Sequence, residues 1–164
     1  SEGGTYTVEE VWPCVEAVVL GIEIVGTRLA GDALVQSSGF QKFADGGLNH
    51  SVVTGPEMLM ADGCRKDLDT VAVRMLINGE EKASGTGAEV LGHPINSLTW
   101  LANSLNKPGI SSSSAAGGAQ SGLLAGDFVM AGAAVFLPKG EGVFKDGDEV
   151  VAVFDGMGEV SAVL

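Results

Sequence analysis

The feature that most constrains the fold is an alternating stretch over residues 70–78 that runs directly into a turn. Its apolar members share one face of an extended chain: Val71, Val73, Met75 and Ile77. Asn78-Gly79 follows, and this pair favours a two-residue hairpin turn because it tolerates the positive φ angles that such a turn needs. The pattern predicts a β-hairpin over residues 70–83, with one face of its first strand in the core.

The rest of the chain alternates between short β-prone runs and two helical segments. Strands are predicted over 21–29, 51–54, 128–136, 150–154 and 160–164, where such runs lie between turn residues. Helices are predicted near 7–19, after the capping box Thr7–Glu10, and over 93–106, with Pro94 in its first turn. Residues 106–122 form a low-complexity loop that we expect to be mobile or to lie against a neighbour. Strands outnumber helices, which indicates a single β-rich α+β domain over 1–164 with two main helices.

A core can be assigned from the apolar faces of these elements. The residues expected to be mostly buried are Val71, Val73, Met75, Ile77, Leu98, Leu101, Val129, Val151 and Val153.

The charge of the chain limits its possible partners. Nine basic residues against 21 acidic ones give a net charge of −12 at pH 7, which disfavours nucleic acid and anionic membrane surfaces. No apolar run approaches the roughly 20 residues of a membrane span, so we expect a soluble protein. Cys14 and Cys64 are too few for a disulfide framework or a zinc site. The chain starts at Ser1 without Met, which fits a trimmed chain or a processed organellar protein.

Several separated motifs carry a resemblance to a known family. They are Leu20–Arg28, Ser84–Asn96 with Trp100-Leu101-Ala102, Leu124–Gly132, and Gly156–Ala162. In this order they resemble the bacterial 2-keto-4-pentenoate hydratases and 4-oxalocrotonate decarboxylases of the fumarylacetoacetate-hydrolase-like superfamily. The resemblance spans about residues 6–164 and covers the C-terminal two-thirds of the family. It implies a β-rich mixed-sheet roll of the C-terminal domain type, lacking the family's N-terminal region.

The resemblance also implies a chemistry. Relatives hydrate 2-hydroxypenta-2,4-dienoate or decarboxylate 4-oxalocrotonate, with carboxylates holding a Mg²⁺ or Mn²⁺ ion that binds the keto-acid oxygens. Of the family's three metal carboxylates only Glu23 has a match here, and the acid/base lysine has none. We therefore expect no cofactor in this chain alone, and Mg²⁺ or Mn²⁺ only if another segment completes the site. Otherwise Glu23, in its apolar strand, would be buried and paired with Arg28 or a backbone donor.

Two further segments are candidates for binding a 2-keto acid. Ser84, Gly85, Thr86 and Gly87 could hold a carboxylate through backbone amides, or could form an ordinary connection from strand to helix. Asp45 could contact substrate, although a loop aspartate between small residues more often shapes a turn. Around it, Gln41, Gly46 and Leu48 stand where the family has Asp, Asn and Ser. His50 and His93 are expected to be structural.

These observations leave three hypotheses for function. The first is a non-catalytic, hydratase-like structural or interaction subunit with protein partners in a larger assembly, because site residues are absent or replaced. The second is a metal-dependent hydratase or keto-acid decarboxylase whose N-terminal half lies elsewhere. The third is a 2-keto acid binding module without turnover.

Overall fold

The computed structural model describes residues 5–28, 36–63, 67–106, 112–113, 119–120, 122–137 and 144–164. The helices are α1 (Val8–Val11), α3 (Gly39–Ala44) and α4 (Pro94–Leu105), and single 3-10 turns cover Trp12–Cys14, Met60–Asp62, Leu68–Thr70 and Gly87–Glu89. The strands are β1 (Ala17–Val25), β2 (Asn49–Leu59), β3 (Ala72–Ile77), β4 (Glu80–Thr86), β5 (Ser112–Ser113), β6 (Ala119–Gln120), β7 (Glu149–Phe154) and β8 (Gly158–Val163). The predicted loop 106–122 lies largely outside the described residues.

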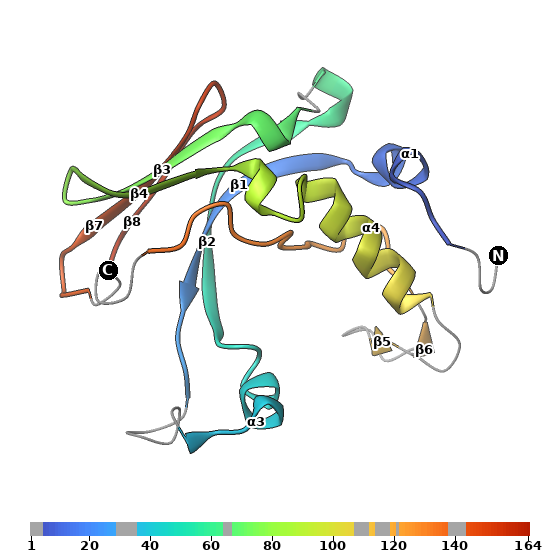
Figure 1. Cartoon of the computed structure of the whole chain (residues 1–164), viewed down its shortest axis with the longest axis horizontal. Coiled ribbons are helices and arrows are strands. Elements are labelled where there is room, and N and C mark those ends of the chain that lie inside the picture. Colours follow the sequence, from blue (N-terminus) through green and yellow to red (C-terminus); the bar gives the residue numbers. More distant parts are fainter. Residues whose placement is uncertain are drawn as a thin grey trace.

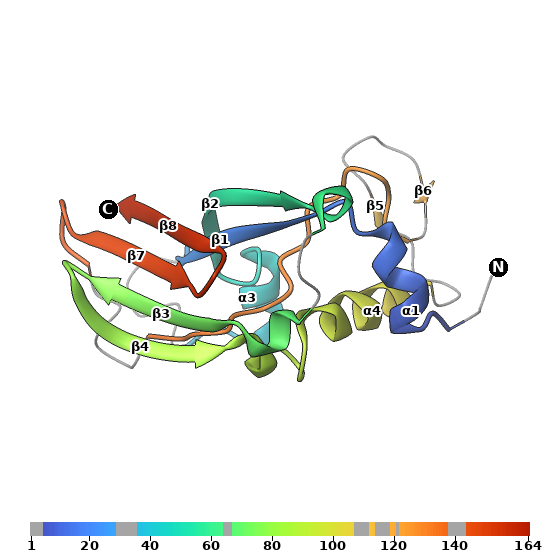
Figure 2. The ribbon, with the colours of Figure 1, turned by 90° about the horizontal axis from the view of Figure 1, so that it is seen from above.

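The longer strands form two layers that face each other, and the short strands β5 and β6 pair separately. One is a four-stranded sheet in the order β4-β3-β7-β8, and the other is the long ladder of β1 with β2 (Figure 1). Seen from above, β1 and β2 lie beside β8, which is the edge strand of the four-stranded sheet (Figure 2). The expected β-rich α+β fold is confirmed. Every pairing between described strands is antiparallel, so the mixture of parallel and antiparallel strands that the resemblance implies is not found among them.

The predicted hairpin is confirmed. β3 and β4 pair around Asn78 and Gly79, whose φ angles are 51° and 81°. Positive φ at both positions is what a type I′ turn requires, and this explains why that dipeptide stands there. β7 and β8 form a second hairpin on the other side of β3.

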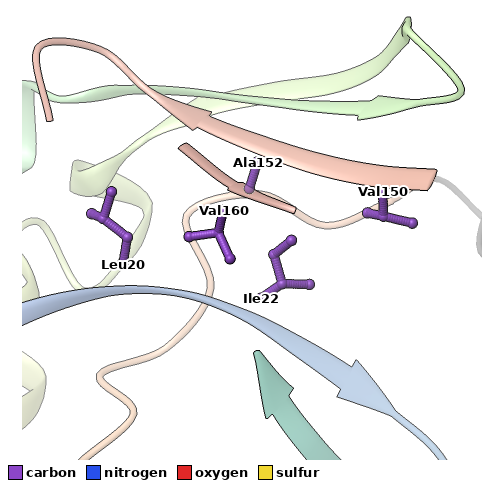
Figure 3. Packing of buried hydrophobic residues seen from close by; sticks show 5 residues of the cluster. All are labelled: Leu20, Ile22, Val150, Ala152 and Val160. Carbon is purple, nitrogen blue, oxygen red and sulfur yellow. The ribbon is translucent and has the colours of Figure 1, made fainter. Parts of the chain in front are cut away.

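The core lies between the two layers. It is formed by Leu20 and Ile22 of β1, Val150 and Ala152 of β7, and Val160 of β8, which point toward one another in Figure 3. Of the nine residues expected in the core, Val71 and Val73 are buried and the other seven are half-buried. On β7 the expected face was wrong, because Val150 and Ala152 point inward instead of Val151 and Val153. Nearly every residue of that strand is apolar, so the sequence shows no alternation that would indicate which face is buried.

The two helix predictions fared differently. The helix over 93–106 is confirmed by α4, and its N-cap is His93, whose Nδ1 accepts from the Ile95 amide at 3.1 Å. The helix near 7–19 was wrong beyond its first turn. Its capping box is present, but α1 ends at Val11, Pro13 lies in a 3-10 turn, and β1 starts at Ala17. The β-branched residues Val18 and Val19 gain more from pairing with β2 than from continuing a helix interrupted by proline.

A third prediction also failed. Residues 128–136 were expected to form a strand, whereas residues 127–137 form neither a strand nor a helix. The segment runs instead as an extended connection below β1 (Figure 1).

Candidate functional site

Glu23 lies near the end of β1, opposite Val52 of β2. Strand alternation places Leu20 and Ile22 in the core and turns Gly21 and Glu23 outward, so the expectation of a buried Glu23 was wrong. Its Oε1 accepts a hydrogen bond from Nδ2 of Asn49 at 2.9 Å. Arg28, the partner considered from the sequence, pairs with Asp45 instead.

Glu23 borders a cavity of about 700 Å³ between the β1 layer, the central sheet and the extended segment 129–137. Most of the lining is apolar, including Met130, Val129 and Ile24. Glu23 is the only charged side chain among the described residues that line this cavity. A single carboxylate at an apolar wall is a suitable group to orient a cation or a hydrogen-bond donor.

Asp45 directly follows α3 and fastens the turn there to the residues just after β1. It is only 8% exposed. Its Oδ2 accepts from the Thr27 hydroxyl at 2.8 Å, and the amide of Arg28 lies 3.1–3.2 Å from both carboxylate oxygens. The Arg28 guanidinium donates to the Asp45 carbonyl at 2.7 Å.

These donors change the acidity of the group. The hydrogen bond from Thr27 is the main reason that the pKa of Asp45 lies below its usual value, and the amide and charge of Arg28 act in the same direction, against the opposing effect of burial. With both oxygens engaged, Asp45 shapes the turn. Its direct contact with a substrate stays a prediction.

The segment 84–87 is packed too closely to be an open loop. A Cβ atom at Gly85 would lie 2.3 Å from the carbonyl oxygen of Ala134, and one at Gly87 would lie 1.9 Å from that of Leu68. The Gly87 amide donates to the Val71 carbonyl at 3.1 Å. These glycines therefore permit close approach of neighbouring backbone.

Of the predicted site residues, the structure brings Glu23 and Gly87 to the same cavity. Ser84, Gly85, Thr86 and Asp45 are not among its lining residues. Sequence reasoning missed Asn49, which contacts Glu23, and Met130, whose sulfur contacts Asn49. Asn49 follows an irregular polar stretch, and Met130 looks like an ordinary core residue. Their contact depends on the strand register, which the sequence does not indicate.

The remaining candidates are structural or lie apart. His93 caps α4, has Nε2 3.7 Å from Asp69 Oδ1, and meets the Trp12 ring edge-on at 5.8 Å, so its structural role is confirmed. His50 is exposed and contacts Ser51, and Cys14 is exposed. Cys64 lies outside the described residues.

Neither a cluster of metal-ligating side chains nor a membrane-spanning helix occurs among the described residues. These residues contain no group of three or more His, Cys, Asp or Glu side chains that could hold a metal ion. No helix among them is long and apolar enough to cross a membrane.

Comparisons with known proteins agree with the fold and extend over nearly the whole chain. The family model described as fumarylacetoacetate (FAA) hydrolase C-terminal matches residues 2–164. A 4-oxalocrotonate decarboxylase of Pseudomonas putida is 31% identical over 156 residues, which cover 93% of this chain and 50% of that protein. A 2-keto-4-pentenoate hydratase of Paraburkholderia xenovorans (strain LB400) is 33% identical over 103 residues, or 63% of this chain and 36% of that protein.

A solved structure agrees with the fold as well. The 4-oxalocrotonate decarboxylase from Pseudomonas putida G7, complexed with magnesium and adipate, superposes with a TM-score of 0.74 at 27% identity. That match covers 95% of this chain and 52% of the decarboxylase chain. The present chain thus spans about half the length of these decarboxylases.

Proposed function

The chain belongs to the family of fumarylacetoacetate hydrolase C-terminal domains, and we propose that it forms part of the active site of a divalent-metal-dependent lyase acting on 2-keto acids. The proposed reaction is the hydration of 2-hydroxypenta-2,4-dienoate or a related keto-acid decarboxylation. The observation that carries the proposal is the position of Glu23, an exposed lone carboxylate at the border of an apolar cavity. It occurs in a chain that superposes on a decarboxylase solved with magnesium and adipate.

The described residues do not by themselves fit a Mg²⁺ ion. Magnesium requires near-octahedral oxygen coordination, and no cluster of three ligating side chains is present in the described ranges. The proposal therefore requires that Glu23 be one ligand among several, the others coming from protein outside those ranges. No chemical step can be assigned to the metal from this chain.

The chain's own contribution is then to shape the site. Leu20, Ile22 and Val129 give the cavity that Glu23 borders an apolar wall. The tight packing of Gly87 against Leu68 fixes the end of β4 at the cavity edge. We also propose that Ser84–Gly87 contacts the substrate carboxylate, for which the free donors would be side-chain hydroxyls, since the Gly87 amide is engaged.

A non-catalytic subunit of a larger assembly is the second candidate. The observation that favours it is the single carboxylate in an otherwise uncharged cavity lining. The relatives reported above are named as enzymes, which favours the lyase. They are bacterial proteins, and they lend no support to processing in an organelle.

The test is turnover by the native protein, purified with any associated chains. Hydration of 2-hydroxypenta-2,4-dienoate and decarboxylation of 4-oxalocrotonate would be measured with Mg²⁺ or Mn²⁺, for the wild type and for Glu23→Gln. The lyase proposal predicts turnover by the wild type. It also predicts that Glu23→Gln reduces this turnover by more than about 10–100-fold, which is the loss typical of removing a group that only supports a metal ligand. Glu57→Gln, an exposed change on β2, is the matched control and should leave turnover unchanged. No turnover of either substrate would favour the scaffold.

A further inference from the structure

We infer that Asn49 is a positioning residue for Glu23, holding the carboxylate by one oxygen and leaving the other for a ligand. The inference rests on the proposed function, because it takes Glu23 to be the acting group. Asn49 Nδ2 donates to Glu23 Oε1 at 2.9 Å and lies 3.8 Å from the Met130 sulfur. Within the described part of the chain, Glu23 has no other hydrogen bond or ion pair, so Oε2 is left without a donor.

A β-bulge brings Asn49 to the correct face. Along the ladder Glu23 pairs with Val52 and Ile24 with Ser51, but Val25 then pairs with Asn49 and skips His50. In a regular ladder His50 would stand opposite Val25, on the Glu23 face, and Asn49 would point to the other side. The extra residue reverses this order, as bulges do where a side chain has to be re-aimed.

The neighbouring strand makes room for the bulge. A Cβ atom at Gly26 would approach the His50 Cβ to 3.0 Å, a distance that requires one of them to shift. The Gly26 amide donates to the Leu48 carbonyl at 2.8 Å, so the strands remain joined beyond the bulge. Glycine at position 26 thus allows His50 to be displaced without separating β1 from β2.

An unfavourable turn precedes Asn49 and is held from both sides. Gly46, Gly47 and Leu48 have φ angles of 82°, 69° and 70°, three consecutive residues in a left-handed region that leucine rarely adopts. The Asp45 contacts with Thr27 and Arg28 fasten this turn to the end of β1. Strained backbone that its surroundings hold in place is typical of functional sites. Here the strain ends at the residue that contacts Glu23.

The contact contributes more to orientation than to stability. Glu23 is exposed, and a hydrogen bond to an exposed, solvated carboxylate adds little to the free energy of unfolding. Its main effect is to limit the rotamers of a side chain that would otherwise move freely beside the cavity. This difference separates a positioning role from a purely structural one.

The experiment measures the order of the Glu23 side chain by NMR. Three-bond couplings that report χ1 of Glu23 would be compared in the wild type, Asn49→Asp, Asn49→Ala and Asn49→Gln. We expect one rotamer in the wild type, loss of that preference in Asn49→Asp and Asn49→Ala, and recovery in Asn49→Gln, which keeps a donor. Asn49→Asp preserves the side-chain volume, so it remains informative if Asn49→Ala disturbs the turn. Ser51→Ala, at the adjacent ladder position, is the control and should keep the wild-type couplings.

A single Glu23 rotamer in both Asn49→Asp and Asn49→Ala would overturn the inference. The result is independent of metal and turnover, so it can be told apart from failure of the proposed function. If Glu23→Gln leaves turnover unchanged while the Asn49 variants release Glu23, the contact stands and the lyase proposal fails. If Glu23→Gln abolishes turnover while Glu23 stays ordered in the Asn49 variants, the lyase proposal stands and the positioning role of Asn49 fails.

Discussion

Asp45 is the residue whose ionisation is most closely tied to the site, because its carboxylate fastens the turn that leads to Asn49. Its hydrogen bonds favour the charged form, so its pKa is lower in the folded than in the unfolded protein. A carboxylate of this kind stabilises the fold above its unfolded pKa of about 3.9, and the stabilisation is lost as the pH falls through the folded value.

Asp45→Asn should therefore be less stable than the wild type at pH 7, and the difference should shrink below about pH 4. The measurement is the Tm of both proteins between pH 7 and pH 2. Asp62→Asn, an exposed change in the 3-10 turn after β2, serves as control and should leave the Tm nearly unchanged at pH 7. A constant difference at every pH would show that Asp45 acts by shape rather than by charge.

Gly87 offers a second test at this scale, since its backbone contact leaves no room for a side chain. The Cβ of Gly87→Ala would lie 1.9 Å from a backbone oxygen that cannot rotate away, so we expect a loss of about 1–3 kcal/mol or more in the free energy of unfolding. Gly39→Ala has no atom within 4 Å of the new Cβ and should change it by less than about 0.5 kcal/mol. Urea denaturation of both variants would measure the two effects. Equal effects would contradict the packing described for the end of β4.

At the scale of elements, β7 decides where the core lies. Val150 is 3% exposed and faces β1, whereas Val151 is half-buried on the opposite face. Val150→Ala should destabilise the protein by about 2 kcal/mol, from the lost burial and the cavity left behind. Val151→Ala should cost clearly less, and the two variants form a matched pair in urea unfolding. The reverse order would place the core on the other face of the sheet.

What the sequence could predict at this scale follows from how local each signal is. The hairpin at Asn78-Gly79, the capping box at Thr7 and the helix starting at Pro94 depend on residues close together in the chain, and all three are present. The helix near 7–19 failed because pairing with a distant strand outweighed local propensity. The inward face of β7 could not be assigned because both of its faces are apolar.

The same reasoning applies to the site. Glu23 was found through a motif, but its exposure and its partner Asn49 depend on a ladder in which one residue is skipped. A one-residue change in register moves every following side chain to the other face, and no local pattern announces it. The positions of Asp45 and of Ser84–Gly87 relative to Glu23 depend likewise on contacts between distant segments.

At the scale of the whole molecule, the net charge of −12 is the dominant long-range property. The ion pairs in the described part of the chain are few, and most join partly exposed groups, as between Arg74 and Glu81 or Lys82 and Glu80. Such pairs contribute little, so repulsion among the acidic groups should outweigh attraction in the folded state. Folding brings these charges closer together than they are in the expanded chain.

Salt should therefore stabilise this protein. Raising the ionic strength from 0.01 to 0.15 M shortens the Debye length from about 30 to about 8 Å, which screens repulsion between separated charges more than the close contacts of ion pairs. We expect the Tm to rise by a few degrees, which for a chain of this size corresponds to about 1 kcal/mol. NaCl and choline chloride should act equally at the same ionic strength, because screening does not depend on the cation. A fall in Tm would mean that ion pairs outweigh repulsion. An additional rise specific to MgCl₂ that disappears in Glu23→Gln would have another meaning, since it would locate a complete cation site within this chain.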